Sequence, residues 1–175
     1  TLGELGELAA AVEQLEQAAR DTAQRLGPTA IEVAFHTFNA TKYLAESGEI
    51  ARAQASAAAA EATFRLHATP DSHFHAASRL RHAMTLLLAR KADAARSEIE
   101  PALADIDRML GPKHPMAQRG REDLALAHLY LGQFEPAERA LRAAAPPSAA
   151  ERPSWRLLHL RSLAARLQGD ADTAV

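Results

Sequence analysis

Length, composition and charge already exclude several kinds of protein. The 175 residues carry 20 Lys and Arg against 22 Asp and Glu, a formal net charge of −2, so no basic excess favours nucleic acid or a membrane surface as a partner. The absence of cysteine excludes disulfides and thiolate metal sites and is typical of a cytoplasmic protein, and no apolar run approaches the roughly 18–20 residues that span a bilayer.

The composition favours closely packed helices. Hydrophobic residues make up 47% of the chain, but aromatic residues make up only 5%. Alanine is abundant, and it is both the strongest helix former and small enough to let helices approach closely. We therefore expect an all-α fold without a bulky globular core.

A forty-two-residue period organises the chain. One marker is a turn residue followed five residues later by alanine: the turn residues are Gly6, Gly48, Arg90 and Gly132, and the alanines are Ala11, Ala53, Ala95 and Ala137. A second marker, proline, recurs with the same spacing at Pro28, Pro70 and Pro112. Proline suits the first turn of a helix and glycine ends a helix in a left-handed turn, so each period predicts two helices joined by a tight turn.

In chain order, the period predicts a truncated hairpin followed by complete ones. The expected helices span about 7–26, 29–47, 49–67, 72–90, 92–110, 114–131, 134–145 and 153–168, and a last one starts at Asp170. The single array then divides into a truncated repeat 1–28, repeats 29–70, 71–112 and 113–152, and a partial repeat 153–175. The segment 143–154 is the one clear loop, and the spacing from Gly132 to the next turn residue, Gly169, shortens to thirty-seven. Pro101 lies inside a predicted helix and should kink it.

Local signals refine the expected helix ends. Thr29 and Glu32 have the spacing of a capping box, and Asp71 or Ser72 can cap the first helix of the next repeat. Arg90 stands where the other repeats have glycine, so its turn should be strained or closed differently.

Residues 110–144 resemble the forty-two-residue tetratricopeptide repeat (TPR) of kinesin light chains. The small–large pattern of that family falls on Leu124, Ala125, His128, Gly132, Phe134, Ala137, Leu141 and Ala144, and the upstream repeats match it more weakly. The resemblance implies a right-handed α-solenoid of about seven or eight stacked helices that binds protein partners and is not an enzyme. Since such arrays occur in bacterial signalling proteins, we expect a scaffold or regulatory segment cut from a larger bacterial protein, with a serine/threonine kinase as the favoured parent.

The resemblance also implies a binding groove on the concave face, which the first helices of the repeats line. In that family the groove-facing residues lie at fixed distances before the turn residue. Counted in this sequence, these positions are Phe35, Phe38, Asn39, Lys42, Leu80, Arg81, Met84, Arg119, Glu122, Leu126, Arg156 and His159. We expect apolar anchors to hold a peptide or partner helix while arginines bind its carboxylates. Two alternatives stay open: these residues are inter-repeat packing and a solvated face, or the array is a sensor that binds a small signalling ligand or peptide.

The eight histidines form no recognisable catalytic or metal motif. The sequence has no HExxH, no glycine-rich phosphate loop and no nucleophile elbow. His73, His75 and His114 fall at repeat junctions, whereas His82 and His128 fall on the packing side of helices, where hydrogen-bonded structural roles are expected. We therefore expect no cofactor, no metal and no catalytic residue, and a hidden hydrolase or metal enzyme is the least favoured alternative.

The ends of the array are expected to be apolar, because each repeat is buried by the next one. This predicts self-association through the exposed end repeats. Trp155, at the start of the last predicted first helix, should either anchor the preceding loop or lie exposed.

Overall fold

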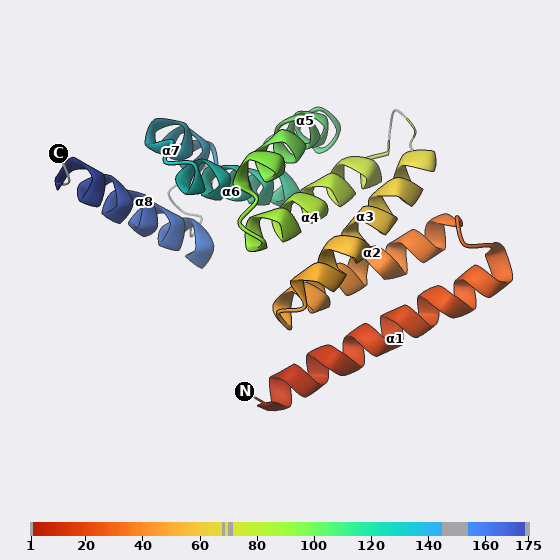
Figure 1. The fold of residues 1–175 in the computed structure, drawn as a ribbon. Coiled ribbons are helices and arrows are strands. Elements are labelled where there is room, and N and C mark those ends of the chain that lie inside the picture. The colour runs from red at the N-terminus through yellow and green to blue at the C-terminus, as the bar shows by residue number, and fades with distance from the viewer. Residues whose placement is uncertain (1, 68, 70–71, 145–153, 174–175) are drawn as a thin grey trace.

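The computed structural model describes residues 2–67, 69, 72–144 and 154–173, and within these ranges the chain forms eight helices and no strand (Figure 1). In order, the helices are α1 (Leu2–Leu26), α2 (Ile31–Glu46), α3 (Ile50–Leu66), α4 (Phe74–Leu88), α5 (Ala92–Leu110), α6 (Pro115–Tyr130), α7 (Phe134–Ala143) and α8 (Trp155–Thr173). The predicted all-α solenoid is confirmed, and most helix ends agree to within a few residues. No described helix is both long and apolar enough to cross a membrane.

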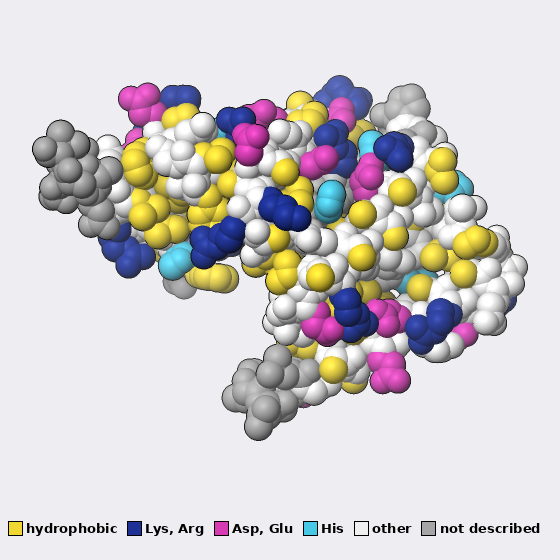
Figure 2. Space-filling view, in the orientation of Figure 1, with side chains coloured by type: hydrophobic (Ala, Val, Ile, Leu, Met, Phe, Trp, Pro, Cys, Tyr) yellow, Lys and Arg dark blue, Asp and Glu magenta, His cyan; other side chains and the backbone are white. Residues whose placement is uncertain are grey.

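Alternate helices form two layers. Each helix packs against the next one in the chain, and α2, α4, α6 and α8 also pack against one another in that order. Within the described ranges, α1, α3, α5 and α7 do not pack against one another in this way, although Arg52 of α3 forms a 2.6 Å ion pair with Glu16 of α1. We call the first set the inner helices and the second set the outer helices. The array bends, so that α1 and α8 stand on either side of a hollow (Figure 2).

Three turns that join an inner helix to the following outer helix close in the same way. Their central residues Gly48, Arg90 and Gly132 have left-handed φ angles of 83°, 60° and 70°. In each turn the N–H of the next residue donates a 2.9 Å hydrogen bond to the carbonyl oxygen five residues before it, in the pairs Glu49–Leu44, Lys91–Leu86 and Gln133–His128. Arg90 is the only non-glycine residue with positive φ in the described part of the chain. The prediction of a strained turn is therefore confirmed, at a conformational cost of about 1–2 kcal/mol.

The alanines that follow these turns allow the two layers to approach closely. Ala53, Ala95 and Ala137 are 0% exposed and each lies in a separate apolar cluster. The most extensive cluster lies between α4, α5 and α6 and contains Ile99 and Ile106, both 0% exposed. Burial of the repeated alanines therefore explains why the period is visible in the sequence.

Two predicted turns do not form. α1 runs through Gly6 and α8 runs through Gly169, and neither glycine has a positive φ. Glycine is tolerated inside a helix at a cost of about 1 kcal/mol, which the favourable residues around it can offset. The predictions that a turn precedes residue 7 and that a new helix starts at Asp170 were wrong.

The predicted helix caps at Thr29 and Ser72 were also wrong. The residue at the N-cap of α2 is Ala30, and at that of α4 it is His73; neither helix start has a side-chain cap bond. Each helix begins later than its capping signal requires, while Asp71 lies outside the described residues. The corresponding cap of α6 does form: His114 Nδ1 accepts a hydrogen bond from the Met116 N–H at 3.2 Å.

Two other local predictions have different outcomes. Pro101 lies within the continuous helix α5, and the kink expected there stays a prediction. The predicted loop 143–154 falls mostly on residues 145–153, which lie outside the described residues.

Candidate binding groove

The inner helices line a groove of about 670 Å³. Residues of α2, α4 and α6 line it, together with Arg156 of α8. Eight of the residues predicted from the repeat offsets line it, namely Phe38, Lys42, Leu80, Arg81, Met84, Arg119, Leu126 and Arg156. The repeat geometry therefore brings together side chains from residues 38 to 156 in one concave site.

Four predicted residues lie elsewhere. Phe35 packs into an aromatic cluster, and its ring centroid lies 5.1 Å from that of Phe64 and 4.8 Å from that of Phe74. These contacts are those of a residue that packs between repeats, which was the alternative to a groove position. Glu122 is buried behind the groove, and Asn39 and His159 are exposed outside it.

The offsets missed one recurring position. Glu46, Leu88 and Tyr130 all line the groove, and each lies two residues before a turn residue. The repeat period could have identified this position, because the three residues are spaced by forty-two. The groove therefore extends closer to the turns than we predicted.

Three of the four cations in the groove face an acidic partner. Lys42 Nζ lies 3.8 Å from Glu46 Oε1, and Arg119 Nε lies 3.9 Å from Asp123 Oδ1. Arg156 Nη2 lies 2.5 Å from the same Asp123 oxygen. These pairs reduce the charge that Lys42, Arg119 and Arg156 offer to a ligand.

Arg81 is different from these three residues. Its guanidinium lies 4.6 Å from the centroid of the Phe38 ring, and it forms no hydrogen bond or ion pair with any residue that the structure describes. Burial, together with the nearby charge of Arg119, lowers the pKa of Arg81 below its usual value. A partly buried guanidinium with free N–H groups is a strong site for a carboxylate.

A buried polar cluster joins α8 to α6 at the end of the groove. Arg156 Nη1 lies 3.3 Å from Glu122 Oε2, and the Ser154 hydroxyl donates a 2.6 Å hydrogen bond to Glu122 Oε1. Glu122 and Asp123 are only 5% and 3% exposed. Burial raises the pKa of Asp123 above its usual value, although Arg156 and Arg119 oppose the shift. The cluster fixes the orientation of Arg156 at the groove.

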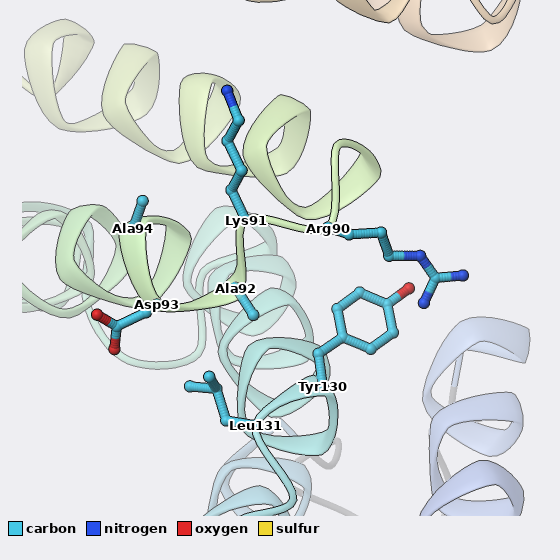
Figure 3. Close-up of a pocket in the computed structure, with 7 residues that line it drawn as sticks. All are labelled: Arg90, Lys91, Ala92, Asp93, Ala94, Tyr130 and Leu131. Atoms are coloured by element: carbon cyan, nitrogen blue, oxygen red, sulfur yellow. The ribbon is translucent and has the colours of Figure 1, made fainter.

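A second, shallower cavity of about 520 Å³ adjoins the groove at the Arg90 turn (Figure 3). The Arg90 guanidinium lies 4.5 Å from the Tyr130 ring centroid. Tyr130 lines both cavities. The wall on the other side comes from the turn and the start of α5, including Lys91 and Asp93.

Several histidines have structural partners. His128 is 9% exposed and its Nδ1 lies 2.7 Å from Gln133 Oε1, as expected for a hydrogen-bonded histidine on the packing side. His75 Nε2 lies 2.9 Å from Glu61 Oε1, a contact that links α4 to α3. Within the described ranges, no three or more histidine or acidic side chains are grouped in a way that could hold a metal ion.

Solved structures with the same arrangement of helices are known. The chain superposes on the crystal structure of a Podosopora anserina kinesin light chain with nearly identical TPR-like repeats, with a TM-score of 0.75 and 20% sequence identity over 95% of this chain and 81% of that chain. The Q17M form of that protein gives a TM-score of 0.79 and 18% identity over 97% of this chain and 82% of that chain. No protein-family model matches the sequence, and no curated protein matches it.

These similarities define the class of fold. The chain is an α-solenoid of TPR-like helical repeats, and the arrangement of inner and outer helices is the one found in the kinesin-light-chain repeats. At this level of identity the likeness concerns the fold, and the groove must be interpreted from its own side chains.

Proposed function

We propose that this chain is a non-enzymatic protein-interaction module that binds a peptide or partner helix in the groove between its inner helices. The observation that carries this proposal is Arg81, a partly buried guanidinium without an acidic partner among the described residues. An unpaired arginine on a concave wall is suited to a carboxylate of a bound partner. In TPR-like arrays, the stacked helices provide an extended concave surface for such a partner.

The apolar part of the groove supports the same function. Met84 and Leu126 are partly exposed, whereas Leu80 is only 7% exposed and also belongs to the core between α4 and α6. Apolar anchors next to a charged group are typical of helix-in-groove recognition. The groove therefore supplies both burial for an apolar side chain and a charge that orients it.

The wider context of the module is part of the proposal. We infer a scaffold or regulatory segment of a larger cytoplasmic bacterial signalling protein, with a serine/threonine kinase as the favoured parent. The alanine-rich and arginine-rich composition and the absence of cysteine support this assignment.

One observation favours a second candidate, a sensor that relays the binding of a small signalling ligand or peptide to a neighbouring domain. The groove volume of about 670 Å³ lies in the range of small-molecule sites. Thermal unfolding with and without a metabolite library would distinguish this candidate, because a bound ligand raises the midpoint by mass action.

The test of the main proposal begins with random peptides displayed on phage and selected on the whole chain. The best peptide is then titrated by calorimetry against Arg81→Gln combined with Arg119→Gln, and against Met84→Glu. We expect each variant to weaken binding roughly tenfold or more. The matched control is Arg108→Gln, which changes an exposed arginine of the outer helix α5.

The two variants separate the parts of the proposal. Unchanged affinity in the double arginine variant would remove the role of the carboxylate, while unchanged affinity in Met84→Glu as well would move the binding site out of the groove. An affinity loss in Arg108→Gln equal to that of the groove variants would point to non-specific charge attraction.

A further inference from the structure

Asp123 is a carboxylate in the wall of the groove, and it faces three arginines. Its Oδ1 lies 2.5 Å from Arg156 Nη2 and 3.9 Å from Arg119 Nε. Arg81 occupies the equivalent position one period earlier, on the neighbouring inner helix α4, and the charge of Asp123 opposes the fall in the pKa of Arg81. Because the axes of packed helices lie roughly 8–10 Å apart, an anion bound to Arg81 also meets the field of Asp123.

Burial fixes the negative charge of Asp123 in place. The residue is only 3% exposed, so water cannot screen its charge as it screens a surface carboxylate. The side chain of Arg119 is 53% exposed and can move toward a ligand. A ligand in the groove therefore meets mobile positive charge next to a fixed negative one.

Among the described residues, the groove has a single positive charge in excess. Its cations are Lys42, Arg81, Arg119 and Arg156, and the carboxylates beside them are Glu46, Asp123 and, behind the wall, Glu122. One excess charge balances one carboxylate of a ligand. It does not balance a phosphoryl monoester, which carries two charges above its second pKa of about 6.

The small excess of positive charge favours singly charged ligands. The cost of removing an ion from water rises with the square of its charge, whereas its attraction to the groove rises only in proportion to the charge. A doubly charged group therefore loses about four times as much hydration free energy for about twice the attraction. An ionised Asp123 reduces this attraction, so the groove disfavours doubly charged groups.

We propose that Asp123 limits the groove to singly charged groups, so that the partner is recognised by a carboxylate and not by a phosphorylated side chain. The inference rests on the proposed function, in which Arg81 binds a carboxylate of the partner, and it deepens that function by naming the charge class of the bound group. Asp123 acts as a specificity-determining residue, because it opposes the wrong ligand more strongly than the right one.

Four small probes with a phenyl ring for the apolar wall test the inference at pH 8. Phenylacetate and methyl phenyl phosphate carry one negative charge, phenyl phosphate carries two, and phenylacetamide carries none. NMR titration of the whole chain follows the Nε–H signals of Arg81 and Arg119. We expect the wild-type chain to bind both singly charged probes roughly tenfold more tightly than phenyl phosphate. Methyl phenyl phosphate separates the effect of charge from that of the phosphoryl group itself.

Asp123→Asn removes the charge and nearly keeps the shape of the side chain. Because the change in attraction is proportional to the charge of the probe, the affinity should rise roughly tenfold for phenylacetate and roughly hundredfold for phenyl phosphate. Phenylacetamide should bind the variant and the wild-type chain equally, which a merely structural role of Asp123 would not produce. The matched control is Asp105→Asn, which removes a carboxylate from the outer helix α5 and should leave every affinity unchanged.

Two results would overturn the inference alone. They are a wild-type chain that binds phenyl phosphate as tightly as phenylacetate, and an Asp123→Asn variant in which both affinities rise by the same factor. Failure of the proposed function looks different: Arg81→Gln would bind phenylacetate as the wild-type chain does, and the inference would fall with it. Circular dichroism checks the folding of each variant, and Asp123→Ser, which also removes the charge, replaces Asp123→Asn if the latter loses helix content.

Discussion

The interface between α4, α5 and α6 and the interface between α6 and α8 hold their helices by different means. The first is built on an apolar cluster that includes Ile99, Leu103 and Ile106, and its ion pairs Arg79–Glu98 and Arg121–Asp107 have partly exposed carboxylates. The second adds buried charges, Glu122 and Asp123 against Arg156, to its apolar contacts. Apolar burial does not depend on protonation, whereas a buried ion pair does. Helices of one array can therefore respond differently to the same change in pH or to loss of one side chain.

The largest effect is expected from removing apolar volume at the centre. Ile99→Ala should lower the free energy of unfolding by about 4 kcal/mol, because the side chain is fully buried and the cavity cannot collapse completely. Urea denaturation followed by circular dichroism measures this change. A loss below about 1 kcal/mol would mean that the centre is less tightly packed than its burial indicates.

Loss of one charged partner between α6 and α8 should lower the free energy of unfolding nearly as much, but its effect should be confined to the neighbourhood of α8. Arg156→Leu leaves Glu122 and Asp123 buried without their arginine, at a cost of about 3 kcal/mol. We expect hydrogen exchange to become faster in α8 while the amides of α5 keep their protection. Equal acceleration in both helices would contradict the separation of the two interfaces.

A smaller effect is expected from pH. The pKa of Asp123 is raised in the folded chain, so the folded state binds its proton at a higher pH than the unfolded state does. The contribution of this residue to stability therefore improves as pH falls toward the usual carboxyl pKa of about 4, and worsens as pH rises through the folded pKa. Relative to Asp123→Asn, the wild-type chain should gain stability between pH about 7 and about 4. A difference that stays constant, or that changes in the opposite direction, would show that pairing with Arg156 outweighs burial.

The smallest effect concerns the Arg90 turn, which belongs to neither interface. Arg90→Gly should relieve about 1 kcal/mol of backbone strain but lose the contact with the Tyr130 ring, so the net gain should be a few tenths of a kcal/mol. In a Tyr130→Leu background the same substitution should stabilise the chain more, and thermal unfolding of the four proteins would measure the difference.

The features that could be predicted from sequence are those that each helical hairpin determines locally. The period located the turns at Gly48, Arg90 and Gly132, because each requires a left-handed residue followed by a small one at a fixed distance. The offsets from these turns also located most of the groove, including Arg81 and Arg119. Both are local consequences of a repeated helical hairpin.

The features that could not be predicted depend on the surroundings. The cluster of Arg156 with Glu122 and Asp123 joins residues more than thirty positions apart, across the place where the period shortens. The helical state of Gly6 and Gly169 also has no local signal, since the same residue type forms turns elsewhere. Residues that resemble each other in a repeat pattern can differ in structure when the neighbouring helix is different.

The three identical turns restrict how such a chain can change in length. One extra residue inside an outer helix would rotate every later side chain of that helix by about 100° and shift it by about 1.5 Å. Substitutions at the surface leave this alignment intact, whereas an insertion before Ala95 would turn that alanine away from α4. Evolution or design can therefore lengthen the array most easily by duplicating a whole forty-two-residue unit, which would extend the groove by one inner helix.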